Sequence, residues 1–268
     1  MGEHNKFYPI DRPEPSPIFL RAFQAAGGYL QRQIESNGGF SYISSGFFKW
    51  IKAELVYPSF DNLTLAYKNR IFSIAIDILD DENKGTLPRF YKERLVAECE
   101  KHDLIPCVFP IRMKSMSPFR RGWNLITPFS HEDIDPMLIA SDEPRLMSDW
   151  EINNFGIQIV RDYLYDQKMN VLSYCDLLDI KPQIWFEDRH KKRKWVYVKN
   201  SQYPNSAEFD GFDIPDAIKE YEGFFAGVSF MPIEKTPPKD WNMYRDQPAE
   251  VNFEGLLPIH SPASFTFD

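Results

Sequence analysis

The feature that most constrains the fold is a pair of apolar runs, 71–79 and 104–111, separated by a segment with helical spacing at 88–102. Both runs have the length of strands, and the second is apolar enough to be buried on both faces of a sheet. Strands and helices that alternate along a chain are typical of layered α/β domains. The sequence therefore predicts an α/β fold, with α+β as the alternative, in which helices flank mixed central sheets.

The rest of the first half adds helices and a hairpin to this core. Four prolines in 7–17 indicate an extended arm, so residues 1–17 are expected to lie outside the folded unit. Spacing of apolar residues predicts helices and strands in the following order: helix 18–34, short helix 45–57, strand 63–67, strand 71–79, helix 88–102 and strand 104–111. Residues 112–148 are polar and contain few regular signals.

The second half begins at a capping box. Ser148 and Glu151 have the spacing at which a helix cap and the third helical residue bond reciprocally, which predicts a helix from 148 to about 167. The pattern then predicts strand 170–174, a hairpin of strands 183–186 and 194–199, helix 214–221 and strand 224–233.

The two halves have nearly the same order of elements, which indicates an internal repeat. Phe109-Pro110-Ile111 and Met231-Pro232-Ile233 end the last strands of the two halves, and a Trp-Asn pair follows each. We therefore expect an α/β unit at 18–140 and a second one at 141–268. The competing interpretation is one mixed sheet built from units that are not repeated.

Composition places the chain among globular proteins. Hydrophobic residues make up 43% and charged residues 26%, which excludes disorder over the whole chain. Aromatic residues reach 15%, and these belong to an aromatic-rich core or to an aromatic binding groove.

The start has no apolar signal region and no window is apolar enough to span a bilayer, so we expect no membrane contact. The three cysteines fit no zinc pattern and are expected to be buried thiols in a cytoplasmic protein: Cys99, Cys107 and Cys175.

The formal net charge of −8 is spread unevenly. Residues 1–140 hold 17 basic and 17 acidic side chains, whereas residues 141–268 hold 14 basic and 22 acidic ones. An acidic second half argues against a general nucleic-acid surface and suits a basic protein partner. It leaves room for a local basic patch.

The segment 182–199, with the helix and strands around it, resembles the core of the restriction-endonuclease-like PD-(D/E)xK superfamily. That core runs helix, three strands, helix, strand, and the resemblance covers about 149–235. In the family an acid at the start of the second strand and a Glu-x-Lys on the third hold a divalent metal, which activates water and neutralises charge on phosphate.

Carried over to this chain, the resemblance implies that the metal site is lost. Gln183 stands at the position of the first acid, and Tyr197-Val198-Lys199 replaces Glu-x-Lys, so only Lys199 is retained. An amide and a phenol are poor ligands for Mg²⁺. Glu151 matches the accessory helix acid of some members, although its capping role explains it equally well. In the first half, Asp77 is the acid near the equivalent strand.

A basic turn connects the two strands of the second hairpin. Its cations are Arg189, Lys191, Lys192, Arg193 and Lys194. One interpretation is a finger that contacts a polyanion, and the other is a solvated hairpin tip. A second basic group follows strand 104–111, and the two groups would converge if the halves pack as repeats: Arg112, Lys114, Arg120 and Arg121.

These observations support three functional hypotheses. The first is a non-catalytic binding or accessory protein with a degenerate nuclease-like fold and no cofactor or metal. The second is an atypical nuclease that uses Mg²⁺ or Mn²⁺ with Lys199 and with Glu151, Glu187 or Asp188. The third is a protein-interaction or immunity-type factor.

Overall fold

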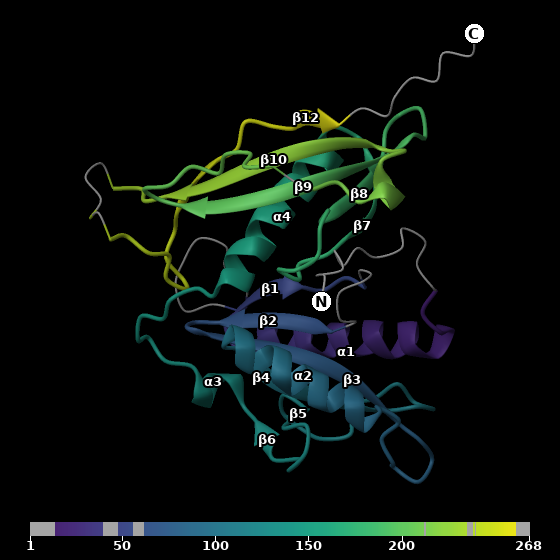
Figure 1. Ribbon diagram of the computed structural model, residues 1–268. Coiled ribbons are helices and arrows are strands. Elements are labelled where there is room, and N and C mark those ends of the chain that lie inside the picture. Colours follow the sequence, from purple (N-terminus) through teal and green to yellow (C-terminus); the bar gives the residue numbers. More distant parts are fainter. Residues whose placement is uncertain are drawn as a thin grey trace.

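The computed structural model describes residues 14–39, 48–55, 62–211, 213–234, 238 and 240–260, which form two mixed β-sheets with helices packed on them. The first sheet has the order β1-β2-β3-β4-β5-β6, and the second has the order β11-β10-β9-β8-β7 with β12 on β10. The first sheet lies below the second in Figure 1, and helix α4 (Asp149–Asp166) lies under the second sheet on the side of the first. The predicted fold class, mixed sheets flanked by helices, is confirmed.

The first sheet is built around an antiparallel meander. Its strands β1 (Phe48–Lys52), β2 (Leu63–Tyr67) and β3 (Arg70–Leu79) pair with their neighbours in antiparallel register. Helix α2 (Arg89–His102) then carries the chain across the sheet to β4 (Ile105–Arg112), which pairs with β3 in parallel. Two short strands extend the edge beyond β4, namely β5 (Leu125–Ile126) and β6 (Asp133–Ile134), before the short helix α3 (Pro136–Ile139).

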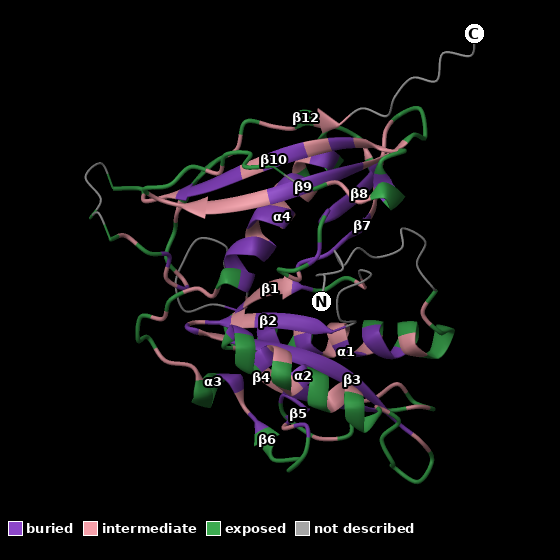
Figure 2. Ribbon diagram, in the orientation of Figure 1, coloured by how far each residue is buried: buried purple, intermediate pink, exposed green. Residues whose placement is uncertain are grey.

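Alternation along β3 explains why helices cover both faces of this sheet. Phe72, Ile74 and Ile76 pack with helix α1 (Pro17–Ser36), whereas Ala75 points the other way and packs with Leu95 of α2. Successive strand residues face opposite sides, so a strand that is buried along its whole length needs cover on both. Figure 2 shows β3 in the colour of buried residues, with the outer side of α2 exposed.

The second sheet repeats the same order of elements. After α4, strands β7 (Asn170–Tyr174), β8 (Ile184–Glu187) and β9 (Arg193–Gln202) form an antiparallel meander. The chain then crosses to β10 (Glu222–Met231), which pairs with β9 in parallel. Strands β11 (Glu250–Asn252) and β12 (Leu257–His260) occupy the outer edge of β10. Both halves therefore run helix, three antiparallel strands, crossover and parallel fourth strand.

Local signals account for the helix ends. Ser16 caps α1 by accepting a hydrogen bond from the Phe19 N–H, and Pro17 occupies the first turn. Past the end of α1, Gly38 and Gly39 have φ values of 111° and 79°, which favour glycine. The predicted capping box of α4 is present, because Ser148 and Glu151 bond reciprocally.

Two predicted helices are wrong. The segment predicted as helix 45–57 contains β1, whose Phe48 stacks on Tyr67 of β2 with ring centroids 4.1 Å apart; 45–47 and 56–57 lie outside the described residues. Pairing with a neighbouring strand outweighs a weak local helical pattern. The helix predicted at 214–221 is a single 3₁₀ turn, η1 (Asp216–Ile218), since the chain must enter β10 four residues later.

The expected arm falls mostly on residues 1–13, outside the described residues, and Pro17 already belongs to α1. The stretch predicted to hold few regular elements, 112–148, contains only β5, β6 and α3 after the end of β4. Within the described residues, none of the helices combines the length and the apolarity that crossing a membrane requires.

Candidate functional site

Gln183, which the resemblance compares with the first acid of the nuclease core, forms a hydrogen bond between its side chain and the backbone of β9. It lies one residue before β8 and is only 3% exposed. Its Oε1 accepts the Val198 N–H of β9 at 2.8 Å, and its own N–H donates to the Val196 oxygen at 3.1 Å. The side-chain oxygen that would have to face a ligand therefore completes the pairing of β8 with β9.

Tyr197 and Lys199 lie on β9, the strand that pairs with β8. Tyr197 is buried with Trp195 and Phe225 on the face of the sheet that η1 covers. The Lys199 ammonium pairs with Asp210 at 2.8 Å. Gln183, Tyr197 and Lys199 all line one polar hollow of about 280 Å³, together with Lys181 and with Asp149 at the start of α4.

Metal ligands are not gathered at this hollow. No group of three or more His, Cys, Asp or Glu side chains suited to a metal ion occurs among the residues that the structure describes. The first-half acid, Asp77, is also structural: it is 5% exposed, accepts the Leu87 N–H at 2.8 Å and lies 3.3 Å from the Lys92 ammonium. Besides Lys181 and Lys199, the hollow is lined by amide groups and by the single carboxylate of Asp149.

Glu151 does not belong to this hollow, contrary to its match with an accessory helix acid. Asp149, Ile152 and Asn153 of α4 line the hollow, and Glu151 projects from the opposite side of the helix because successive residues turn by about 100°. Its carboxylate accepts from the Ser148 N–H at 2.8 Å and is 2% exposed. Glu151, a candidate for the accessory acid, and Lys199 therefore line different pockets.

The partner of Glu151 is Arg245, which connects the two halves. The Arg245 guanidinium contacts Glu151 through Nε at 2.9 Å and through Nη2 at 2.7 Å. Its Nη1 donates to the Asn69 oxygen in the β2–β3 turn, and its Nη2 donates to the Asp103 oxygen at the end of α2, both at 3.0 Å. One buried cation thus binds the carboxylate of the second half and two carbonyls of the first.

The turn between β8 and β9 is organised by its own acid. The Asp188 carboxylate accepts the His190 and Lys192 N–H groups at 2.8 and 3.0 Å. Lys194 pairs with Asp188 at 3.1 Å and with Glu222 of β10 at 2.7 Å. Arg193 is partly buried, while the other three cations of the turn are exposed: Arg189, Lys191 and Lys192.

The second basic group does not meet this turn. It borders the connection from β4 to β5 at the bottom of Figure 1, whereas β8 and β9 lie in the upper sheet. Lys114 pairs with Asp81 at 2.8 Å and Arg120 with Asp133 at 2.6 Å. Arg112 bonds the Pro118 oxygen at 2.7 Å, and Arg121 is exposed nearby. The expected convergence of the two basic groups is wrong.

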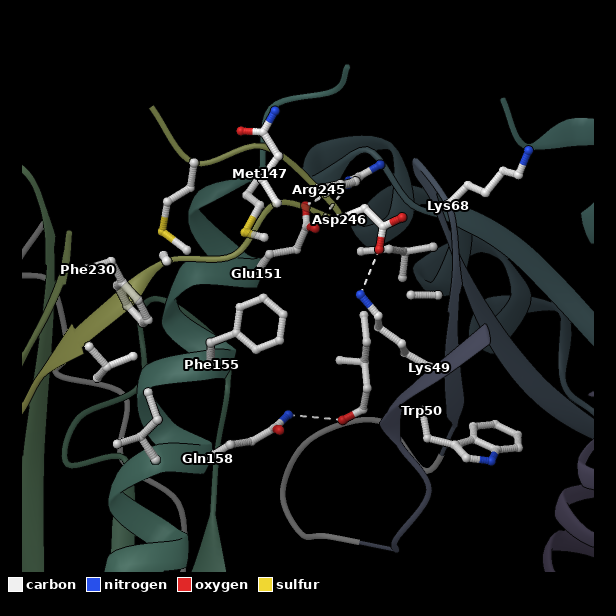
Figure 3. A pocket seen from close by; sticks show the side chains of 18 of the residues that line it. Lys49, Trp50, Lys68, Met147, Glu151, Phe155, Gln158, Phe230, Arg245 and Asp246 are labelled. Carbon is white, nitrogen blue, oxygen red and sulfur yellow. Dashed lines mark hydrogen bonds and ion pairs between the residues drawn. The ribbon is translucent and has the colours of Figure 1, made fainter. Parts of the chain in front are cut away.

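A larger pocket lies between the halves. It has a volume of about 430 Å³ and is lined by residues of β1, the β2–β3 hairpin, α4 with the segment before it, β10 and the segment 243–251. Figure 3 shows Phe155 of α4 facing its interior, with the Lys49–Asp246 pair beside it. Sequence reasoning missed this pocket because its lining residues come from five distant segments, so no local motif marks them.

The three cysteines are free and buried, as expected. Burial raises the pKa of the Cys99 thiol and of the Cys175 thiol to about 12, and the neighbouring Asp176 adds to the effect at Cys175. Such thiols stay protonated at neutral pH and are poor nucleophiles.

Comparison with known protein families finds a match in the second half of the chain. A family model described as a domain of unknown function (DUF8840) matches residues 150–259, from the second residue of α4 into β12. The matched segment therefore contains the second helix–meander–crossover–strand unit and its two edge strands. Neither the curated proteins nor the solved structures gave a match to this chain.

Proposed function

We propose that this protein is a non-catalytic binding or accessory protein whose second half has a nuclease-like core without metal chemistry. The order helix, three antiparallel strands, crossover and parallel strand supports the likeness in fold. The observation that carries the loss of chemistry is the hydrogen bond from the Val198 N–H to the Gln183 side chain. A neutral amide committed to the backbone neither binds Mg²⁺ well nor activates water.

A metal titration tests this proposal against the nuclease alternative. Calorimetry with MgCl₂ and MnCl₂ is expected to show no saturable binding, and labelled single- and double-stranded DNA and RNA are expected to stay intact. Cleavage that needs the metal and disappears in Lys199→Ala, but not in the exposed control Lys219→Ala, would establish a nuclease instead. The other acids proposed for that alternative lie elsewhere, since Asp188 holds the β8–β9 turn and Glu187 accepts from Asn170.

The exposed cations of the β8–β9 turn are the proposed contact for a polyanion. Arg189, Lys191 and Lys192 extend from the end of a hairpin whose base is held by Asp188 and Lys194. Replacing Lys191 and Lys192 by Glu is expected to abolish retention on a heparin or nucleic-acid matrix at low salt, because exposed phosphate contacts are electrostatic. The matched control replaces Lys84 and Lys101, which are also exposed and lie in the first half. Equal retention of both double variants would exclude the turn as the contact.

A basic protein partner is the second candidate, and the charge of the second half favours it. Residues 141–268 carry 22 acidic and 14 basic side chains. Complementary charge accelerates association and gives salt-sensitive complexes. Affinity capture from the source cell, eluted by a salt gradient, is expected to release a basic protein; recovery of nucleic acid alone in the same fractions would support the polyanion instead.

A further inference from the structure

The pocket between the halves, with a volume of about 430 Å³, is separate from the Gln183 hollow. Glu151, Phe155 and Ile159 of α4 line the pocket, whereas Asp149 and Asn153 line the hollow on the other side of the same helix. A volume of about 430 Å³ lies in the range of small-molecule sites, which commonly form between structural units.

The wall of the pocket is mainly apolar and adaptable. Its apolar side chains include two phenylalanine rings and two methionines: Phe155, Ile159, Phe230, Met147, Met243 and Val251. Phe155, Ile159 and Met147 are only partly buried, so a ligand would complete their burial. Methionine side chains are flexible and polarisable, and they adjust to irregular or aromatic ligands.

The charged lining residues already have partners within the protein. Lys49 pairs with Asp246 at 2.6 Å, and Arg245 pairs with Glu151 at 2.7 Å. The remaining two pair with residues outside the lining, Lys68 with Asp142 at 2.8 Å and Asp162 with Arg161 at 2.7 Å. A charged ligand would have to compete with these pairs, whereas an uncharged ligand leaves them intact.

We propose that this pocket binds an uncharged, predominantly apolar small molecule with a ring or branched chain, which packs against Phe155 and the two methionines between the halves. The proposal adds a ligand class to the proposed binding function, and it rests on that function being a binding one. It does not depend on nucleic acid or on a protein partner.

Titration of the full chain with the uncharged dye Nile red tests the proposal. We expect saturable binding with a rise in fluorescence. Ala249→Phe places a phenyl ring in the pocket, where it occupies space that the dye would fill. The dye then buries less apolar surface, so its binding should weaken about tenfold or more. Ala97→Phe on the exposed side of α2 is the matched control and should leave the dissociation constant unchanged.

Two further measurements keep the result interpretable. Val251→Phe changes a lining side chain that is 46% exposed, so it should fold even if Ala249→Phe does not, and it should also weaken the dye. The melting temperature of each variant is measured in parallel. Dye affinity that is unchanged in both folded variants, or absent from the wild type, would overturn the proposal.

The anionic dye ANS separates ligand classes. Tighter binding of ANS than of Nile red, sensitive to Ala249→Phe, would overturn the proposal of an uncharged ligand. Heparin retention of the Ala249→Phe variant should equal that of the wild type, so failure of the pocket and failure of the polyanion contact give different results.

Discussion

At the scale of single residues, the Gln183 side chain stabilises the pairing of β8 with β9. Replacing it with Leu removes the acceptor of the buried Val198 N–H, and an unsatisfied buried donor costs about 1–3 kcal/mol. We expect the free energy of unfolding in urea to fall by that amount. Gln24→Leu on the exposed side of α1 should change it by less than about 0.5 kcal/mol. Equal effects of the two substitutions would mean that the Gln183 side chain does not satisfy this donor.

His102 makes stability depend on pH. Burial lowers the pKa of His102, and the neighbouring Lys101 adds to the effect, although Glu98 and Asp176 oppose it. The unfolded chain then takes up a proton near the ordinary histidine pKa of about 6.5, while the folded chain does not. Stability should therefore be fully present above about pH 6.5 and decrease below it.

The measurement is the urea midpoint at pH 7.5, 6.5 and 5.5. A His102→Gln variant removes this titration, so its midpoint should vary less over the same range than that of the wild type. A wild-type midpoint that rises as the pH falls from 7.5 to 5.5, with no such rise in the variant, would mean that the folded state takes up the proton instead.

At the scale of elements, Gly28 of α1 and Gly223 of β10 differ in the space that is available for a side chain. A Cβ at Gly28, inside α1, would lie 3.7 Å from its nearest neighbour, an ordinary contact. A Cβ at Gly223 of β10 would lie 2.1 Å from the ring of Trp195, which is fully buried and directly opposite in the parallel pair.

The two alanine substitutions should therefore have opposite signs. Gly28→Ala should stabilise the protein by about 0.5–1 kcal/mol, because alanine restricts the unfolded chain and favours helix. Gly223→Ala should destabilise it by about 1–3 kcal/mol, because the Trp195 ring must move within a packed core. Chemical denaturation of both variants measures the difference, and a shift of the same sign in both would contradict it.

Sequence patterns predicted most elements but assigned two of them incorrectly. Helix α4 and strands β3 and β4 have strong periodicity or long apolar runs, and these signals are local. Strand β1 has a weak pattern and forms because β2 offers it an edge, which a local window does not contain. The segment at 214–221 has Pro215 at the start of a helical pattern, yet β10 begins too soon for more than one turn.

At the scale of the whole molecule, Arg245 connects the two halves. Arg245→Met would leave the Glu151 carboxylate buried without its cation, which typically costs about 3–5 kcal/mol. We expect calorimetry to show a lower melting temperature and two separated transitions, because the halves have separate hydrophobic cores.

Matched variants distinguish this coupling from simple loss of a charge. Adding Glu151→Leu to Arg245→Met should recover part of the loss, since the unpaired carboxylate is removed. Lys49→Met breaks the Lys49–Asp246 pair, whose lysine side chain is 33% exposed, and should cost no more than about 1 kcal/mol. A single transition in Arg245→Met at the wild-type temperature would show that other contacts join the halves.

The sequence alone determined most of the local elements, the capping box at Ser148 and Glu151, and the absence of acids at the Gln183 and Tyr197 positions. These properties depend on residue types and on spacings of a few residues. Only the tertiary structure decided that Glu151 pairs with Arg245, 94 positions away, and that the two basic groups stay apart. The pocket likewise exists only where segments from both halves meet. The physical reason is that periodicity records which face of an element is buried, whereas the identity of the partner on that face depends on how distant segments pack.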